Sequence, residues 1–206
     1  SLFKPRMLLT VPGSITGVEE RAMIDAIVEA GARKAYLTES SLATAVGTGV
    51  DISKPDGRLV IDIGSGKTDV AVVSLDGVVE GRSVKTAGAA FDEAIVRYIR
   101  TKHNVVIGMR TAEELKRSIG GIVPREDDPL EEVKGRCLAT GMPKTVTVTS
   151  KELAEVLVEP TKKVLEAVHS VLERTPPELV GDIGRNGIIM SGGGSLLYGL
   201  DRIVSR

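Results

Sequence analysis

The chain has 206 residues, of which 42% are hydrophobic, so it can form one large domain or two small ones with a buried core. Its formal net charge of -1 and aromatic content of 2% give no electrostatic or base-stacking reason to expect a nucleic acid partner. Cys137 is the single cysteine, which excludes an internal disulfide framework and favours a reducing compartment. We therefore expect a globular α/β protein of the cytoplasm.

The first residues combine an apolar pair, Leu2 and Phe3, with two cations, Lys4 and Arg6. Such a patch can insert apolar side chains into a membrane surface while its cations meet anionic lipid. It can equally be a chain start that packs on neighbouring structure. The residues alone leave both interpretations open.

A βαβ unit is predicted next. Residues 7–11 favour a strand, Thr16 and Glu19 form a capping box before an apolar helical stripe over 18–30, and residues 34–38 favour a second strand. Two strands that are joined by a helix in this way should be parallel.

The segment Glu39-Ser40-Ser41 follows the second strand of this unit. It lies at the carboxyl end of the strand, where α/β proteins commonly place ligands. The turn-rich segment Lys54-Pro-Asp-Gly57 then marks a candidate domain boundary.

A glycine-rich hairpin is the most informative stretch. Residues 59–63 and 69–75 favour strands, Gly64-Ser65-Gly66 separates them, and Asp76-Gly77 is a two-residue turn signal. Glycines let backbone N–H groups converge on an anion, and Asp62 beside them can hold a hydrated magnesium ion. The stretch therefore predicts a hairpin that binds phosphate and magnesium, with an ordinary hairpin turn as the alternative.

The residues Gly66-Lys67-Thr68 imitate the end of a P-loop, but the rest of that motif is missing. A P-loop needs a glycine five residues before the Gly-Lys pair, where this chain has Ile61. It also needs a following helix, whereas residues 69–75 are strand-like. We therefore exclude a P-loop.

Another capping box, Thr111-Ala-Glu-Glu114, predicts a helix that ends near Ile119. Glu113, Lys116 and Arg117 share one polar face of this helix. From spacing alone, a solvated face is the default interpretation.

The last third of the chain predicts a long helix and a second glycine-rich turn. Thr149-Ser-Lys-Glu152 is a capping box, and Pro160 should break the helix that it opens. A strand is expected over 187–190. Gly192-Gly193-Gly194 then forms a strand-to-helix turn, with a helix beginning at Leu196, and such a turn exposes N–H groups to a ligand.

Taken together, these elements resemble the MreB/Mbl family of bacterial actins, within the actin-like ATPase superfamily. Besides the hairpin and the second glycine turn, the matching stretches cover nearly the whole chain: Leu2–Arg6, Val11-Pro12, Glu29–Ala32, Asp92–Ile95, Arg110–Glu113, Thr140–Pro143 and Arg174–Leu179. The resemblance implies an actin-like, RNase H-like α/β fold. It divides the chain into a partial subdomain IA (1–54), subdomain IIA with the hairpin (55–90), mainly subdomain IIB (91–149), and subdomain IIA with the adenosine loop (150–206).

The resemblance also implies an ATP and Mg²⁺ site. Its residues would be Asp62 for the metal, Gly64, Ser65, Gly66, Lys67 and Thr68 for the phosphates, Glu113 and Lys116 for ribose and base, and Gly192, Gly193 and Gly194 for adenosine. Leu2 and Phe3 would be the membrane-insertion residues, which favours the membrane interpretation of the first residues.

Several positions depart from the family pattern. Ser40 stands where the family carries the glutamate that orients the attacking water, with Glu39 beside it, and a serine has no charge with which to polarise water. Ser65 and Lys67 replace a glycine and a threonine of the hairpin, and Ala89 replaces an aspartate. Hydrolysis is therefore in more doubt than nucleotide binding.

We interpret the chain as an ATP-binding, self-associating cytoskeletal subunit at the inner membrane face, with other morphogenesis proteins as expected partners. It is expected to be a fragment that lacks the first phosphate loop and the C-terminal end. The alternatives are a degenerate scaffold without ATP turnover, a chaperone-type ATPase, which would need a substrate-binding domain, and a sugar kinase, which would need an aspartate base.

Overall fold

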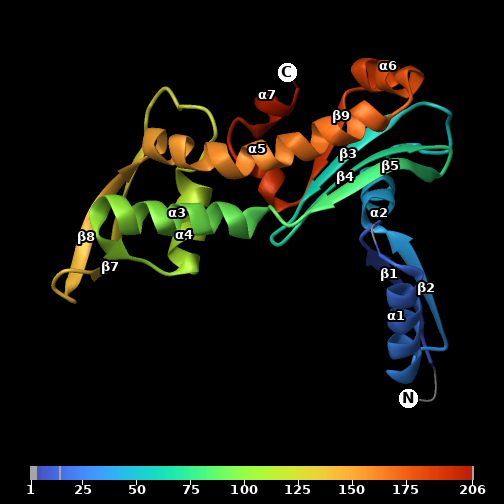
Figure 1. Ribbon diagram of the computed structural model, residues 1–206, viewed down its shortest axis with the longest axis horizontal. Coiled ribbons are helices and arrows are strands. Elements are labelled where there is room, and N and C mark those ends of the chain that lie inside the picture. Colours follow the sequence, from blue (N-terminus) through green and yellow to red (C-terminus); the bar gives the residue numbers. More distant parts are fainter. Residues whose placement is uncertain (1–3, 14, 206) are drawn as a thin grey trace. The chain divides into compact units, whose positions relative to one another are not determined.

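The computed structural model describes residues 4–13 and 15–205, and the chain divides into two compact units (Figure 1). The first contains residues 1–62, 69–83 and 170–189, and the second contains residues 63–68, 84–169 and 190–206. Leu2 and Phe3, on which the membrane prediction rests, lie outside the described residues. Within the described part, none of the helices has the length and apolar character needed to cross a bilayer.

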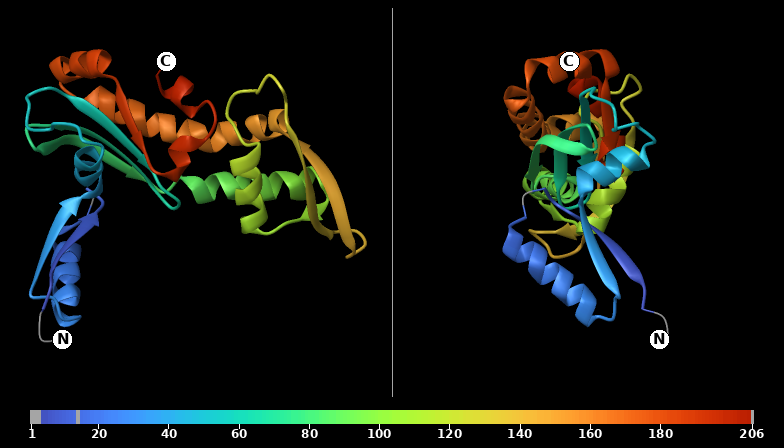
Figure 2. Two further views of the ribbon diagram at one scale, coloured as in Figure 1. Left: turned by 180° about the vertical axis from the view of Figure 1, so that it is seen from behind. Right: turned by 90° about the vertical axis from the view of Figure 1, so that its right-hand side faces the viewer.

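The first unit begins with the predicted βαβ unit. Strands β1 (Arg6–Val11) and β2 (Lys34–Glu39) pair in parallel, and α1 (Gly17–Glu29) runs alongside them (Figure 2). The Thr16 hydroxyl accepts the Glu19 N–H, and the Glu19 carboxylate accepts the Thr16 N–H at 2.8 Å. The parallel pairing and the capping box are both confirmed, because each depends on local sequence.

The hairpin strands form a four-stranded sheet in the order β5-β4-β3-β9. These strands are Gly77–Val84, Thr68–Ser74, Arg58–Ile63 and Ile188–Ser191. Every residue of β4 is buried, as expected for an inner strand that is covered on both faces. Helix α2 (Ser40–Gly47) contributes Ala45 to an apolar cluster with Ile52, Val60 and Val73. Helix α6 (Pro177–Asn186) completes the unit.

The turn between β4 and β5 lies one residue earlier than predicted. Leu75 and Asp76, rather than Asp76 and Gly77, occupy its centre, with φ of 50° and 60°. The Leu75 N–H donates to Lys54 O at 3.1 Å, and the Asp76 N–H donates to Ile52 O at 2.8 Å. These two hydrogen bonds hold non-glycine residues in a left-handed conformation that glycine would adopt more readily.

The second unit consists mainly of helices and an antiparallel sheet. Helices α3 (Gly88–His103) and α4 (Met109–Ser118) contact each other, and the sheet has the order β6-β7-β8, with strands Val105–Val106, Leu130–Cys137 and Pro143–Thr149. Helix α5 (Ser150–Arg174) follows, and its last five residues belong to the first unit. The largest fully buried side chains of this unit include Phe91, Ile95, Ile99, Leu153, Leu157 and Leu200.

The predicted break at Pro160 is wrong, because α5 is continuous. Pro160 is buried, and Leu153, Leu157 and Val164 are buried on either side of it in the same stripe. An internal proline costs about 3 kcal/mol. Burial of each large apolar side chain contributes about 1.5–3 kcal/mol, so the stripe as a whole outweighs the proline.

Two further local predictions fail at helix starts. Helix α4 begins at Met109, so Thr111 already lies inside it, and Glu114 accepts a hydrogen bond from Arg110 Nε at 3.1 Å. At the second glycine turn, residues Gly193–Leu196 form a single 3-10 turn (η1), and α7 begins only at Leu200 and runs to Val204. Tyr198 pairs with Gly121 between them, which requires an extended backbone there.

Candidate functional site

A cavity of about 520 Å³ lies within the second unit, in the size range of small-molecule sites. Five stretches that are distant in sequence form its wall: the hairpin tip, the start of α3, helix α4, the segment after α4, and the second glycine turn. The lining residues are Gly64, Ser65, Gly88, Phe91, Asp92, Glu113, Lys116, Arg117, Gly120, Arg125, Gly193, Gly194, Leu196 and Leu197. Six residues of the predicted nucleotide site are thus brought together: Gly64, Ser65, Glu113, Lys116, Gly193 and Gly194.

The other predicted nucleotide residues are not part of this wall in the described structure: Asp62, Gly66, Lys67, Thr68 and Gly192. Thr68 is fully buried, and its hydroxyl donates to Thr86 O at 2.7 Å, so its side chain holds the hairpin base. Asp62 is half-buried on β3. Residues 4–13 and 15–205 contain no group of three or more metal-ligating side chains, but Mg²⁺ commonly takes one carboxylate together with substrate phosphates.

The hairpin tip is fixed by backbone hydrogen bonds to α3. The Gly64 N–H donates to Lys67 O at 3.0 Å and closes the turn. Gly64 O accepts the Gly88 N–H at 3.0 Å, and Ser65 O accepts the Ala89 N–H at 2.7 Å. These two N–H groups of the first turn of α3 are therefore satisfied by the hairpin, where they would otherwise be open to an anion.

The inner wall carries an ion pair between Lys116 of α4 and Asp92 of α3. Lys116 Nζ lies 2.8 Å from Asp92 Oδ1 and donates to Gly88 O at 3.1 Å. Burial raises the pKa of the Asp92 carboxyl, the Lys116 ammonium opposes that rise, and Glu113 adds to it. Sequence reasoning did not select Asp92 as a site residue. The available signal was a lone carboxylate directly after the buried Phe91 on an otherwise apolar helix face.

The second glycine turn uses its glycines in different ways. A Cβ on Gly194 would overlap the Ile63 side chain and lie 3.0 Å from Ile63 O, so close packing requires glycine there. A Cβ on Gly193 would meet nothing within 4 Å. Gly192 has a φ of 82°, which other residues rarely adopt. Leu196 is 85% exposed and lines the cavity.

Arg125 is a wall residue that sequence reasoning missed. Its guanidinium donates to Ser118 O at 3.3 Å and to Gly120 O at 3.1 Å, which ties it to the end of α4. It also lies 4.6 Å from the centroid of the Tyr198 ring, and Arg202 lies 5.6 Å from that ring. Because the Tyr198 contact joins segments that are distant in sequence, no local pattern marks Arg125 as a wall residue.

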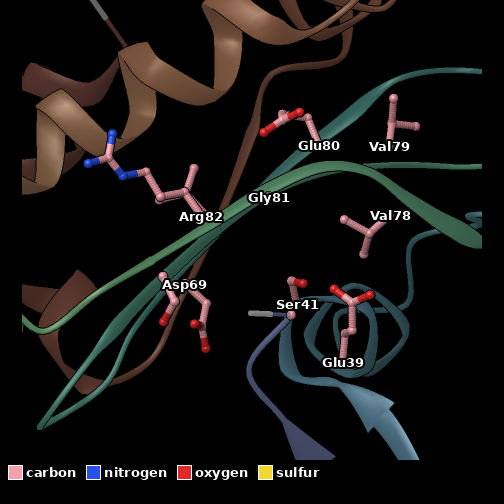
Figure 3. A pocket seen from close by; sticks show the side chains of 11 residues that line it. Glu39, Ser41, Asp69, Val78, Val79, Glu80, Gly81 and Arg82 are labelled. Atoms are coloured by element: carbon pink, nitrogen blue, oxygen red, sulfur yellow. The ribbon is translucent and has the colours of Figure 1, made fainter. Parts of the chain in front are cut away.

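A smaller cavity of about 230 Å³ lies within the first unit. It is lined by Gly13, Glu39, Ser41, Asp69, Val70, Val78, Val79, Glu80, Gly81, Arg82 and Ser83. In Figure 3, Glu39 points toward Val78 and the Arg82 guanidinium points away from Glu39. Ser40 is not part of the wall as described, and its hydroxyl donates to Val11 O at 3.2 Å. Three carboxylates and one guanidinium make this wall acidic.

The residues of the larger cavity fit a nucleotide. A Cβ at Gly88 would press on the backbone of Gly64 and Ser65, and a Cβ at Gly194 would press on Ile63. Glycine at these two positions therefore lets α3 and the second glycine turn pack closely against the hairpin beside the cavity. Lys116, Arg117 and Arg125 give the wall positive charge, and the exposed Glu113 carboxylate can accept hydrogen bonds from hydroxyl groups. An anionic ligand with a polar ring matches this donor set.

Comparison with known proteins places these observations in a family. Residues 1–206 match the family model described as MreB/Mbl protein. The cell shape-determining protein MreB of Escherichia coli (strain K12) is 44% identical over 200 residues, which are 97% of this chain and 58% of that protein.

Solved structures agree with the family match. The structure of MreB5 of Spiroplasma citri bound to ADP has a TM-score of 0.93 at 39% identity and covers 97% of this chain and 61% of that one. A MamK double helical filament has a TM-score of 0.78 at 19% identity, covers 98% of this chain and 59% of that one, and supports the fold alone. The chain therefore spans between 58% and 61% of the length of these proteins.

Proposed function

Because this chain belongs to the MreB/Mbl family of actin-like proteins, we propose that the intact protein is an ATP-binding subunit of a filament that organises cell shape at the inner face of the cytoplasmic membrane. The carrying observation is the cavity of the second unit, where the hairpin tip, α4 and the second glycine turn share one wall. The ADP bound in the structure of Spiroplasma citri MreB5 supports a nucleotide as the ligand.

In this proposal the predicted site residues have separate tasks, and Asp62, residues 66–68 and Gly192 are included although they lie outside the described cavity wall. The backbone of residues 64–68 would hold the phosphates, and Asp62 would hold a hydrated Mg²⁺. Glu113 would accept from the ribose, and residues 192–194 would adjoin the adenosine. A nucleotide that binds one conformation of the intact protein more tightly than another shifts the equilibrium toward that conformation. The difference between the two affinities sets how far the nucleotide can bias filament assembly. The four-segment division into subdomains IA, IIA and IIB, inferred from the resemblance, remains part of the proposal.

Calorimetric titration of the intact protein with ATP and Mg²⁺ tests the site. The Gly193→Asp variant places a carboxylate in open space beside the cavity, and Gly181→Asp, also in open space but on α6, is its matched control. Charge repulsion should weaken ATP binding at least about tenfold in the first variant and leave it unchanged in the second. Equal affinities in the two variants, or no binding by the parent protein, would contradict the proposal.

Filament formation is tested by sedimentation of the intact protein with ATP. The solved double helical filament of MamK, which shares the fold, is in line with this part of the proposal. Pelleting above a critical concentration is the expected result.

A degenerate scaffold without turnover is the second candidate. It is favoured by the Ser40 hydroxyl, which bonds to Val11 O and carries no charge for water activation.

We also propose that the protein associates with anionic membranes through Leu2 and Phe3, beside Lys4 and Arg6. Each inserted apolar side chain should contribute about 1.5–3 kcal/mol. Sedimentation with anionic liposomes would compare the intact protein with its Leu2→Ser/Phe3→Ser variant. Equal binding by the two proteins would remove this part of the proposal.

A further inference from the structure

Arg125 is held in the wall of the larger cavity by bonds to the protein itself. Its Nη1 donates to Ser118 O at 3.3 Å, and its Nη2 donates to Gly120 O at 3.1 Å. Its Nε is buried and makes no hydrogen bond with the residues that the structure describes. Because two nitrogens are bonded to the end of α4 and the third is buried, the guanidinium has its flat face rather than its edge to offer a ligand.

Tyr198 supports this guanidinium. Arg125 Cζ lies over the Tyr198 ring, 4.6 Å from its centroid. The backbone of Tyr198 is itself fixed, because its carbonyl accepts the Ile122 N–H at 2.9 Å and the residue pairs with Gly121 in a parallel bridge. A side chain that is already ordered loses little conformational freedom when a ligand packs on it. The pair is therefore pre-organised to receive a planar group.

The surroundings of Arg125 suit the ring of a ligand better than its phosphates. Leu196 lines the same wall and is 85% exposed, so the wall offers apolar surface next to its cations. An aromatic ring can bury apolar area there and present its π face to a cation. A phosphate, in contrast, is best recognised by the N–H edge of an arginine, and in Arg125 that edge is bonded to backbone carbonyls.

We infer that Arg125, supported by Tyr198, binds the ring of the nucleotide by stacking and thereby selects large planar bases. The inference rests on the proposed nucleotide function, and it deepens that function by naming a residue that determines base specificity. The roles proposed for α4 are unchanged. A purine presents two fused rings to the guanidinium and a pyrimidine presents one, so this contact favours purine nucleotides.

Arg125→Lys separates stacking from charge, because it keeps the positive charge and removes the flat guanidinium. Calorimetric titration of the intact protein should show the dissociation constants of ADP and adenosine both rising about fivefold, since the two ligands share the base. The preference for ADP over UDP should shrink about threefold. Arg202→Lys is the matched control. It changes the other guanidinium near Tyr198, which is not in the described wall, and should leave all three constants unchanged.

Unchanged affinities in Arg125→Lys would show that only the charge matters and would overturn the inference. Weaker binding of ADP with unchanged binding of adenosine would assign Arg125 to the phosphates, which also contradicts stacking. Equal losses in Arg125→Lys and Arg202→Lys would place the effect on Tyr198 instead. If the parent protein binds no nucleotide, the proposed function fails and the inference fails with it. Urea unfolding would establish that each variant is folded.

Discussion

Two of the cavities in the described structure, one in each unit, differ in the charge of their walls. The cavity of the second unit contains three cations and two carboxylates, and one of those carboxylates, Asp92, is paired with Lys116. The cavity of the first unit contains three carboxylates, Glu39, Asp69 and Glu80, and one guanidinium. The cations of the second unit's cavity attract a polyphosphate, and the carboxylates of the first unit's cavity repel it. Charge alone therefore favours the second unit as the place that holds an anionic ligand.

The two walls also differ in how they are assembled. The cavity of the second unit draws on five separate stretches, and glycines at two of its joins allow close backbone approach. The acidic cavity draws on the ends of the βαβ unit and on two adjacent strands. A ligand site made from many stretches is rigid only if the contacts between those stretches are rigid. Residues that hold the stretches together are therefore as important to the site as residues that touch the ligand.

The largest expected effect concerns Ser40, next to the acidic cavity. If the family glutamate orients water, Ser40→Glu should raise the ATP turnover of the intact protein by about 10² or more at saturating ATP. The substitution also removes the Ser40 hydrogen bond to Val11 O, so stability should be measured in parallel.

Ser40→Gln is the matched control, because it has the same length without the charge. Turnover should rise with glutamate and not with glutamine. A parent protein that already hydrolyses ATP as fast as Ser40→Glu would show that Glu39 or another group suffices. The degenerate-scaffold candidate would then be excluded.

The second prediction compares Gly194, where close packing excludes a side chain, with Gly193, which faces open space. Gly194→Ala forces a Cβ into the Ile63 side chain and should destabilise the protein by about 1–3 kcal/mol. Gly193→Ala meets nothing within 4 Å and should leave the free energy of unfolding nearly unchanged. Urea unfolding of the two variants is the measurement, and equal destabilisation would mean that the turn is held differently from its described packing.

Elements with a local signal could be predicted from the sequence. The capping boxes at Thr16 and Thr149 both form, and at the second the Thr149 N–H donates to Glu152 at 2.9 Å. The failures at Thr111, Pro160 and Leu196 have another cause. At Thr111, the helix already begins at Met109, and Glu114 pairs with Arg110 of the same helix instead of capping it. At Pro160 a buried stripe, and at Leu196 a strand pairing with a distant segment, decide the local backbone.

The candidate site follows the same rule. Its two glycine turns are continuous motifs, so sequence reasoning found them and the structure brings parts of both to one wall. Asp92 and Arg125 belong to that wall only because α3 and the segment after α4 fold against it. Their partners, Lys116 and Tyr198, are far from them in sequence, and no spacing rule connects such pairs.

Arg125 provides the third prediction. Arg125→Gln removes one cation from the cavity wall and the contact with the Tyr198 ring, a contact worth about 0.5–2 kcal/mol. The free energy of unfolding should fall by about that amount, and ATP affinity should fall severalfold. Arg202→Gln removes the other guanidinium near Tyr198. Because Arg202 is not in the described wall, this variant should leave the ATP affinity unchanged. Equal loss of ATP affinity in both variants would assign the effect to Tyr198 rather than to cavity charge.

The smallest expected effect is a difference in pH dependence between one carboxylate of each unit. In the first unit, Asp182 Oδ2 accepts the Gly57 N–H at 3.0 Å, and this hydrogen bond keeps the Asp182 pKa below its ordinary value. Its contribution to stability is therefore present above the unfolded-state pKa and is lost as the pH falls through the folded pKa. In the second unit, burial raises the Asp92 pKa, so its contribution is most favourable at low pH and declines as the pH rises through the folded pKa.

Urea unfolding of the nucleotide-free protein between about pH 3 and pH 7 tests these opposite signs. Relative to the parent protein, Asp182→Asn should flatten the loss of stability on acidification. Asp92→Asn should remove a term that falls with rising pH, and its curve should therefore climb more steeply between pH 4 and pH 7 than that of the parent, on the order of tenths of a kcal/mol. Parallel curves for the two variants would mean that the Lys116 ammonium, rather than burial, dominates the titration of Asp92, and that the wall of the second unit is electrostatically more open than its ion pair indicates.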